Sequence, residues 1–110
     1  MSYILCRCED IVEGAARGFV IGAGLDRRDI VLVRMRGVLL AYLNSCPHQS
    51  TPLETFPDTF LNEDGTLFVC STHGARFRVE DGYCVSGPCV GKSLASIPYE
   101  VRDGMISVQV

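Results

Sequence analysis

Cys46-Pro47-His48 and Cys70-Ser71-Thr72-His73 decide how this chain folds, because these two segments combine cysteine with histidine. Each supplies one thiol and one imidazole, and the chain has no other histidine. Thiolates and imidazoles are the ligands that zinc and iron–sulfur centres take from proteins. Two mixed pairs therefore predict one metal centre that both segments share.

The composition predicts one apolar domain. The 110 residues fit a single domain, 1–110, and 47% of them are apolar, which argues against disorder. A net charge of −3 is small and of the wrong sign for nucleic-acid binding. Residues 1–7 lack the features of a signal peptide, and the longest apolar run, 38–43, is far shorter than the ~20 residues of a membrane span. We therefore expect a soluble, cytoplasmic protein with no nucleic-acid or membrane partner.

Short β-rich runs alternate with turn signals along the chain, the pattern of an all-β sandwich or barrel. Arg36-Gly37, Asp81-Gly82 and Asp103-Gly104 are hairpin-type turn pairs. One helical turn is expected within residues 9–14. The predicted strands are residues 3–8, 18–21, 30–34, 38–43, 67–69, 76–79, 83–85, 95–101 and 105–110.

Both candidate ligand segments fall at strand ends. Cys46 follows the predicted strand 38–43, and Cys70 ends the strand 67–69. Two loops on a rigid scaffold would then converge on one centre. We expect a cluster-binding subdomain over about 44–91, and a base sheet from the remainder with the N- and C-terminal strands adjacent.

The motifs Cys-Pro-His-Gln at 46–49, Cys-x-x-His-Gly-Ala-Arg-Phe at 70–77 and Asp-Gly-x-Cys-x-x-Gly-Pro at 81–88 resemble the Rieske ferredoxin family. In a Rieske centre, two histidines replace two cysteines on one iron of a [2Fe–2S] cluster. The resemblance implies an all-β, antiparallel Rieske-type sandwich with an inserted cluster-binding subdomain.

The resemblance also implies the ligands and the role. Cys46 and Cys70 would bind one iron of a single [2Fe–2S] cluster, and His48 and His73 the other. Rieske ferredoxins are not enzymes. They carry single electrons from a flavin-dependent ferredoxin reductase to a terminal oxygenase or another redox enzyme.

Two departures from the family pattern affect these expectations. Residues 49–69, between His48 and Cys70, form a longer gap than the family usually has, which leaves the partner open. Quinol-oxidising Rieske proteins carry a disulfide between the cluster loops and a hydroxyl near the cluster. Thr51, Thr72 and Ala75 stand at those positions here, so we expect a lower potential.

Three other functions stay open. The first is a Rieske-like accessory subunit of a larger redox enzyme such as assimilatory nitrite reductase. The second is a zinc-stabilised structural module, because zinc also accepts two cysteines and two histidines. The third, a nucleophilic cysteine–histidine enzyme, would explain one pair but not two.

The remaining cysteines, and the acidic residues between His48 and Cys70, can be explained without a role in metal binding. Cys6 and Cys8 would share one face of a strand and serve as small buried hydrophobes. For Cys84 and Cys89, which flank Pro88, free thiols are expected and a bridge stays open. The acidic residues form either a solvated loop or a docking surface: Glu54, Asp58, Glu63 and Asp64. Phe77 and Tyr83 are expected to pack in the core.

Overall fold

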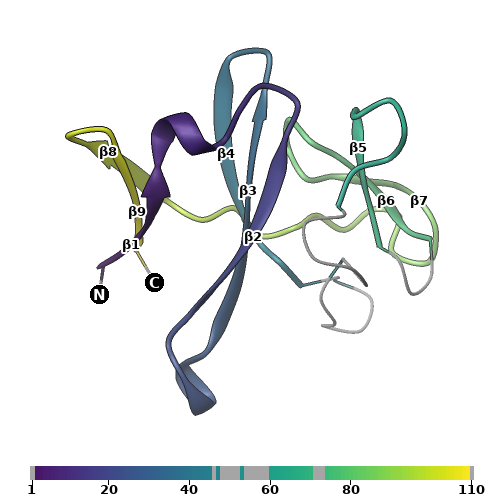
Figure 1. The fold of residues 1–110 in the computed structure, drawn as a ribbon. Helices are drawn as coiled ribbons and strands as arrows, with labels where there is room; N and C mark the ends of the chain where they lie inside the picture. The colour runs from purple at the N-terminus through teal and green to yellow at the C-terminus, as the bar shows by residue number, and fades with distance from the viewer. Residues whose placement is uncertain (1, 46, 48–52, 54–59, 71–73, 110) are drawn as a thin grey trace.

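The computed structural model describes residues 2–45, 47, 53, 60–70 and 74–109 (Figure 1). In this part of the chain, nine strands and two short 3₁₀ turns follow one another. The strands are β1 (Ser2–Arg7), β2 (Ala16–Ile21), β3 (Arg28–Met35), β4 (Val38–Leu43), β5 (Leu67–Val69), β6 (Arg76–Arg78), β7 (Cys84–Ser86), β8 (Tyr99–Arg102) and β9 (Met105–Gln109). The 3₁₀ turns are η1 (Cys8–Asp10) and η2 (Gly24–Asp26).

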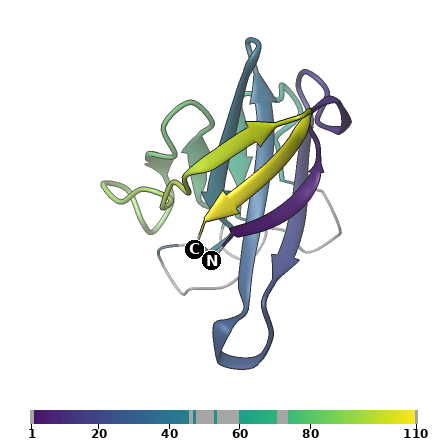
Figure 2. The same cartoon turned by 90° about the vertical axis from the view of Figure 1, so that its left-hand side faces the viewer.

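The strands form three antiparallel sheets, each of three strands. We call β1-β9-β8 the terminal sheet, β2-β3-β4 the middle sheet and β5-β6-β7 the third sheet. Figure 1 shows the middle sheet between the other two. Figure 2 shows the two chain ends side by side, because β1 pairs with β9.

The middle sheet is buried on both faces, and β3 shows why. Its four central residues are fully buried and alternate between two apolar cores. Ile30 and Leu32 face the first core, shared with the terminal sheet, whereas Val31 and Val33 face the second core, shared with the third sheet. The apolar run 30–33 is thus a strand covered on both sides.

The sequence correctly predicted an all-β antiparallel sandwich and each of its strands, with shifted ends. The expected helical turn is present in part, as η1. The adjacency of the terminal strands is confirmed. A single base sheet outside residues 44–91 was wrong, because the two faces of the apolar middle sheet each need a separate covering layer. The cluster-binding subdomain over about 44–91 stays a prediction.

The predicted strand 95–101 is divided at Pro98. Before the proline, the Leu43 N–H donates to the Ala95 carbonyl over 2.8 Å, and the Ile97 N–H donates to the Ala41 carbonyl over 2.9 Å. After it, β8 pairs with β9 instead. Proline has no N–H to donate, so a ladder ends where it stands. This segment links the edge of the middle sheet to the terminal sheet.

Two of the predicted hairpin turns are confirmed. Arg36-Gly37 and Asp103-Gly104 have positive φ at both residues, which is the signature of a type I′ turn. Between β6 and β7 the turn is longer, and within Asp81-Gly82 only the glycine has positive φ. Among the helices of the described residues, none is long and apolar enough to span a bilayer.

Candidate functional site

Cys70 is the one candidate ligand among the described residues, and it lies directly after β5. Its side chain is 0% exposed. The Cys70 N–H donates to the Ala75 carbonyl over 2.8 Å, and the Gly74 N–H donates to the Cys70 carbonyl over 2.8 Å. These two bonds join Cys70, directly after β5, to Gly74 and Ala75, directly before β6. Cys46, His48 and His73 lie outside the described residues, so their ligand roles stay predictions.

Apolar side chains surround Cys70 and keep it dry. It belongs to the second core, and Phe68 and Phe77, paired across β5 and β6, are both fully buried there. Charges interact more strongly in such a low-dielectric setting than in water. The buried members of this core are Ala16, Val31, Val33, Tyr42, Leu53, Phe60, Phe68, Cys70, Ala75, Phe77, Val79, Cys84, Cys89 and Leu94.

The proline loop, residues 86–91, packs against the loop that Cys70 begins. Gly87 has a φ of +98°, and a Cβ on it would lie 2.6 Å from the Ala75 Cα. Only glycine allows this approach. The proline loop therefore packs directly on Ala75, one of the residues that hold Cys70. For Gly74, the described atoms leave open space around a Cβ, so its φ of +71° is the observed reason for glycine.

Asn44 lies just before the segment that contains Cys46 and His48. It was not among the functional residues predicted from the sequence. Its side chain is 6% exposed, and its Oδ1 accepts the Leu53 N–H over 2.8 Å. Its own N–H donates to the Asp29 carbonyl over 2.7 Å. Leu53 is fully buried, so Asn44 ties the far end of the segment with Cys46 and His48 to the middle sheet. A polar residue directly after the apolar strand β4 was the available signal.

Tyr42 joins the middle sheet to the third sheet and was also missed. Its hydroxyl donates to the Val79 carbonyl over 2.6 Å. Its ring meets Phe68 edge-on, with centroids 5.7 Å apart. Burial raises the pKa of Tyr42 to about 12, and the nearby Asp81 and Glu80 carboxylates add to the rise. The hydroxyl therefore stays protonated and keeps donating.

Cys6 and Cys8 do not form a metal site with any of the described residues. A bulge interrupts β1 between Ile4 and Cys6, and Cys8 lies in η1 rather than in the strand, so the expected shared strand face was wrong. Both side chains are partly buried against the first core, as expected of small hydrophobes. Burial is the main cause that raises the pKa of the Cys6 thiol. The described residues hold no set of three cysteine, histidine, aspartate or glutamate side chains suited to a metal.

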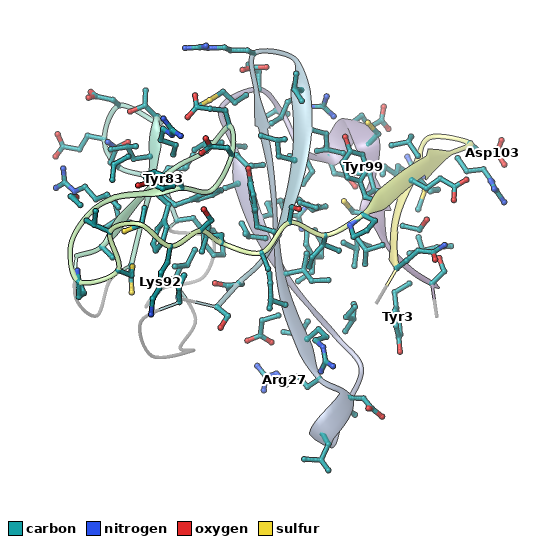
Figure 3. The ribbon with its side chains drawn as sticks, turned by 180° about the vertical axis from the view of Figure 1, so that it is seen from behind. Tyr3, Arg27, Tyr83, Lys92, Tyr99 and Asp103 are labelled. Carbon is teal, nitrogen blue, oxygen red and sulfur yellow. The ribbon has the colours of Figure 1, made fainter. Side chains whose placement is uncertain are left out.

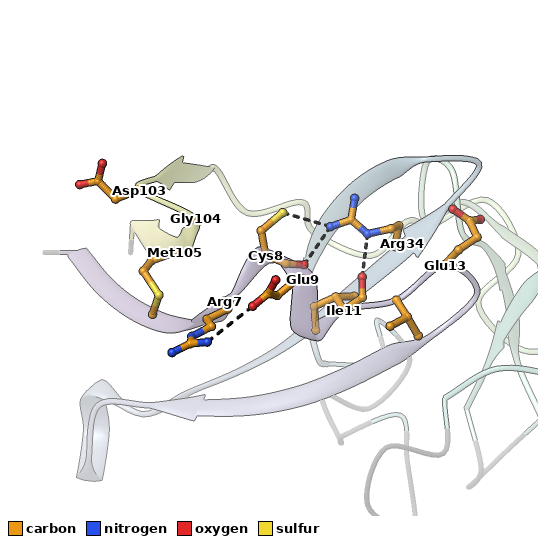
Figure 4. Close-up of a pocket in the computed structure, with 10 residues that line it drawn as sticks. Arg7, Cys8, Glu9, Ile11, Glu13, Arg34, Asp103, Gly104 and Met105 are labelled. Carbon is orange, nitrogen blue, oxygen red and sulfur yellow. Dashed lines mark hydrogen bonds and ion pairs between the residues drawn. The ribbon is translucent and has the colours of Figure 1, made fainter.

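A surface pocket lies at η1, on residues outside the ligand segments (Figure 4). Arg34 lines it and secures η1: its Nε–H donates to the Ile11 carbonyl over 2.6 Å, and Nη2 to the Cys8 carbonyl over 3.0 Å. Nη2 also lies 3.1 Å from the Cys8 Sγ. Because its guanidinium donates to these backbone carbonyls, Arg34 anchors the N-terminal segment to the middle sheet.

The surface near the third sheet carries charge on short hairpins. Glu63 and Asp64 are exposed, as a solvated loop or a docking surface requires, and Glu54 and Asp58 lie outside the described residues. Phe77 is in the core as predicted, but Tyr83 is 37% exposed, so its predicted core position was wrong. The Arg78 guanidinium lies over its ring, 5.1 Å from the centroid. Figure 3 shows Tyr83 and Lys92 on this side of the molecule and Tyr99 and Asp103 on the other.

Comparisons with known proteins give the chain its family. The model of the Rieske [2Fe-2S] domain matches residues 1–100. The ferredoxin component of the alkene monooxygenase system of Xanthobacter autotrophicus (strain ATCC BAA-1158 / Py2) is 32% identical over 104 residues, which are 94% of this chain and 77% of the relative.

Solved structures share the fold. One is a chain from a complex of reduced oxygenase and oxidized ferredoxin in carbazole 1,9a-dioxygenase, with a TM-score of 0.73, 23% identity, and coverage of 97% of this chain and 91% of that one. Another is the ferredoxin of carbazole 1,9a-dioxygenase from Nocardioides aromaticivorans IC177, with a TM-score of 0.71, 20% identity and coverage of 98% and 96%. The chain belongs to the Rieske [2Fe-2S] domain family, whose cofactor is a [2Fe–2S] cluster, and it is a ferredoxin, an electron carrier rather than an enzyme.

Proposed function

We propose that this ferredoxin carries single electrons from a flavin-dependent reductase to a terminal oxygenase, in the cytoplasm. The relative from Xanthobacter autotrophicus is the ferredoxin component of an alkene monooxygenase system. One structure with the same fold comes from a complex of oxygenase and ferredoxin. Both support an oxygenase as the electron acceptor.

The ligand set of the proposal is Cys46, His48, Cys70 and His73. Cys70 supports it by its position, because a fully buried thiol directly after a paired strand is a suitable iron ligand. Two thiolates and two neutral imidazoles balance the charge of the oxidised cluster. When bound, the cluster supplies one-electron chemistry at a higher potential than a four-cysteine cluster would.

Hydrogen bonds and one close packing contact hold the segments that contain the proposed ligands. The carbonyl of Ala75 and the N–H of Gly74 hold the loop that contains Cys70. Gly87 lets the proline loop lie directly against Ala75. Asn44 secures the other segment at Leu53. The observation that carries the proposal is the fully buried Cys70 thiol in a member of the Rieske family.

Reconstitution tests the role. The purified ferredoxin would be mixed with NADH, a flavin-dependent ferredoxin reductase and a terminal oxygenase, and product formation would be followed. We expect turnover to require the ferredoxin and to rise with its concentration. Cys70→Ala should abolish turnover, whereas Cys6→Ser, which alters a cysteine of the first core, should retain it.

The same experiment separates the alternatives. A protein with a normal cluster that is reduced by the reductase but never reoxidised by the oxygenase contradicts the proposed acceptor. Stable co-purification with a nitrite reductase would identify an accessory subunit instead. Recovery in the membrane fraction after cell lysis would contradict the cytoplasmic location.

A further inference from the structure

Cys84 and Cys89 form a pair of buried thiols that electron transfer does not use. Their Sγ atoms lie 3.3 Å apart, and the residues are 0% and 1% exposed. Neither cysteine is part of a disulfide in this structure. Cys84 begins β7, and Cys89 lies in the turn after the proline loop's Pro88. Tyr83 and Lys92, labelled in Figure 3, stand just outside this segment on either side.

Backbone hydrogen bonds hold the two cysteines beside each other. The Cys84 N–H donates to the Lys92 carbonyl over 2.8 Å, and the Lys92 N–H donates to the Cys89 carbonyl over 3.0 Å. Lys92 therefore bridges the strand and the turn. A disulfide needs its sulfurs about 2.0 Å apart, so the present 3.3 Å must shorten by about 1.3 Å. Small side-chain movements within a held backbone can supply that change.

We propose that Cys84 and Cys89 are an oxidisable dithiol, which hydrogen peroxide converts into an intrachain disulfide that fastens the proline loop to β7. The proposal goes beyond the electron-carrier role and does not depend on it. It uses described residues alone, and it assigns a modification to a pair of thiols whose contact the fold maintains.

The reaction has two balanced steps. One thiol sulfur attacks a peroxide oxygen, the O–O bond breaks, and the products are a sulfenic acid and one water. The second sulfur then attacks the sulfenic sulfur; the S–O bond breaks, the disulfide forms, and the thiol proton leaves with the hydroxide as a second water. In total, two thiols and one peroxide give one disulfide and two waters, and the two electrons pass from sulfur to oxygen.

The burial of Cys84 and Cys89 favours a small oxidant, and their contact limits further oxidation of the sulfenic acid. A bulky disulfide reagent cannot reach residues that are 0% and 1% exposed, whereas hydrogen peroxide is small and uncharged. Once one sulfur carries a sulfenic acid, the other already lies in contact with it, and a reaction within a held pair is much faster than one between free molecules. The disulfide should therefore form before further oxidation of the first sulfur.

The disulfide would act on the loop next to Cys70. Cys89 belongs to the proline loop, and Gly87 of the same loop lies against Ala75, whose carbonyl accepts the Cys70 N–H. Closing the bridge shortens the link across this loop. The amide hydrogens of residues 87 and 89–91 should then exchange more slowly with solvent.

Peptide mapping of the cluster-loaded protein tests the proposal. The protein is treated with hydrogen peroxide at levels that leave its visible absorption unchanged, then denatured, alkylated and cleaved with trypsin. Cleavage after Arg78 and Lys92 gives a peptide, 79–92, that contains both cysteines and no other. We expect this peptide to lose two hydrogens and to escape alkylation at both positions together, and to regain both sites after dithiothreitol.

The same digest contains its own controls. Cys6 and Cys8 fall in peptides 1–7 and 8–17 and should remain alkylated. Cys89→Ser should leave Cys84 to be oxidised alone, without a disulfide and without slower exchange at residues 87 and 89–91. The proposal is overturned if peptide 79–92 stays fully alkylated while Cys6 or Cys8 is oxidised, or if its two cysteines are oxidised independently.

Discussion

Asn44 is a buried amide that holds Leu53, at the end of the segment with the proposed ligands Cys46 and His48. Its Oδ1 accepts the Leu53 N–H over 2.8 Å. Asn44→Ala should lower the free energy of unfolding by about 1–3 kcal/mol, because it leaves a buried N–H without this acceptor. Denaturant unfolding measures the loss, and iron content per chain should fall with it.

Asn62→Ala is the matched control for Asn44. The Asn62 Oδ1 accepts the N–H groups of Thr66 and Leu67 in the hairpin before β5, where water can take over. This variant should cost less stability and keep its full iron content. Equal iron loss in the two variants would contradict the role assigned to Asn44.

Tyr42 is the second residue with a testable contribution. Tyr42→Phe removes the hydroxyl from the Val79 carbonyl and should cost about 1 kcal/mol. Tyr99→Phe removes a similar bond to the Leu39 carbonyl from a side chain that is 38% exposed, and should cost less.

The raised pKa of Tyr42 gives the same bond a pH signature. Because the folded-state pKa of about 12 lies above the ordinary phenol pKa, this contribution is complete below the ordinary value. It is lost as the pH rises through about 12. Denaturant unfolding at rising alkaline pH should show a steeper loss in the natural protein than in Tyr42→Phe. Parallel curves would contradict the assignment.

Sequence reasoning found the residues whose chemistry is unusual and missed those whose importance is positional. Cys70 was predicted to be a ligand because a cysteine and a histidine three residues apart form a recognisable pattern, and that role stays a prediction. Asn44 and Tyr42 carry no such pattern; their roles come from Leu53 and Val79, distant residues that meet them after folding.

At the scale of elements, strand identity followed from local sequence but sheet membership did not. The apolar run 30–33 predicts a buried strand, yet nothing in it tells that successive residues face two different cores. The division of 95–101 at Pro98 had a local signal, the missing N–H. The prediction nevertheless placed one strand across Pro98, because the pairing of 95–97 with β4 and of β8 with β9 is decided only in the folded molecule.

The contact between the proline loop and the Cys70 loop is the element-scale prediction. A Cβ at Gly87 would lie 2.6 Å from the Ala75 Cα, closer than real contacts. Gly87→Ala should therefore force the two loops apart and cost about 1–3 kcal/mol beyond the backbone strain at positive φ. Chemical unfolding measures the cost, and visible absorption reports cluster retention.

Gly91→Ala separates crowding from backbone strain. Gly91 has a similar φ, +95°, but no described atom lies within 4 Å of where its Cβ would be. The Gly91→Ala variant should therefore suffer only the backbone strain of a positive φ, and it should keep its cluster. If Gly91→Ala proves as damaging as Gly87→Ala, close packing of the loops is not what the glycine at 87 provides.

The whole molecule is built from three sheets, and the middle sheet shares one apolar core with each of the other two. Its potential should lie near the low end of the Rieske range, about −150 mV. Ala75 has no hydroxyl to donate, and fewer donors stabilise the reduced state less. Ala75→Ser should raise the midpoint in a redox titration. A strongly positive midpoint in the natural protein would show that other donors dominate.

The most direct test of the central claim is the visible and EPR spectrum of the purified protein and its ligand variants. The natural protein should be coloured and, once reduced, show a Rieske-type EPR signal. Replacing Cys46, His48, Cys70 or His73 with alanine should abolish this spectrum, while Cys6→Ser and Cys84→Ser leave it intact. A colourless protein that holds zinc, or a native spectrum in Cys70→Ala, would contradict the account.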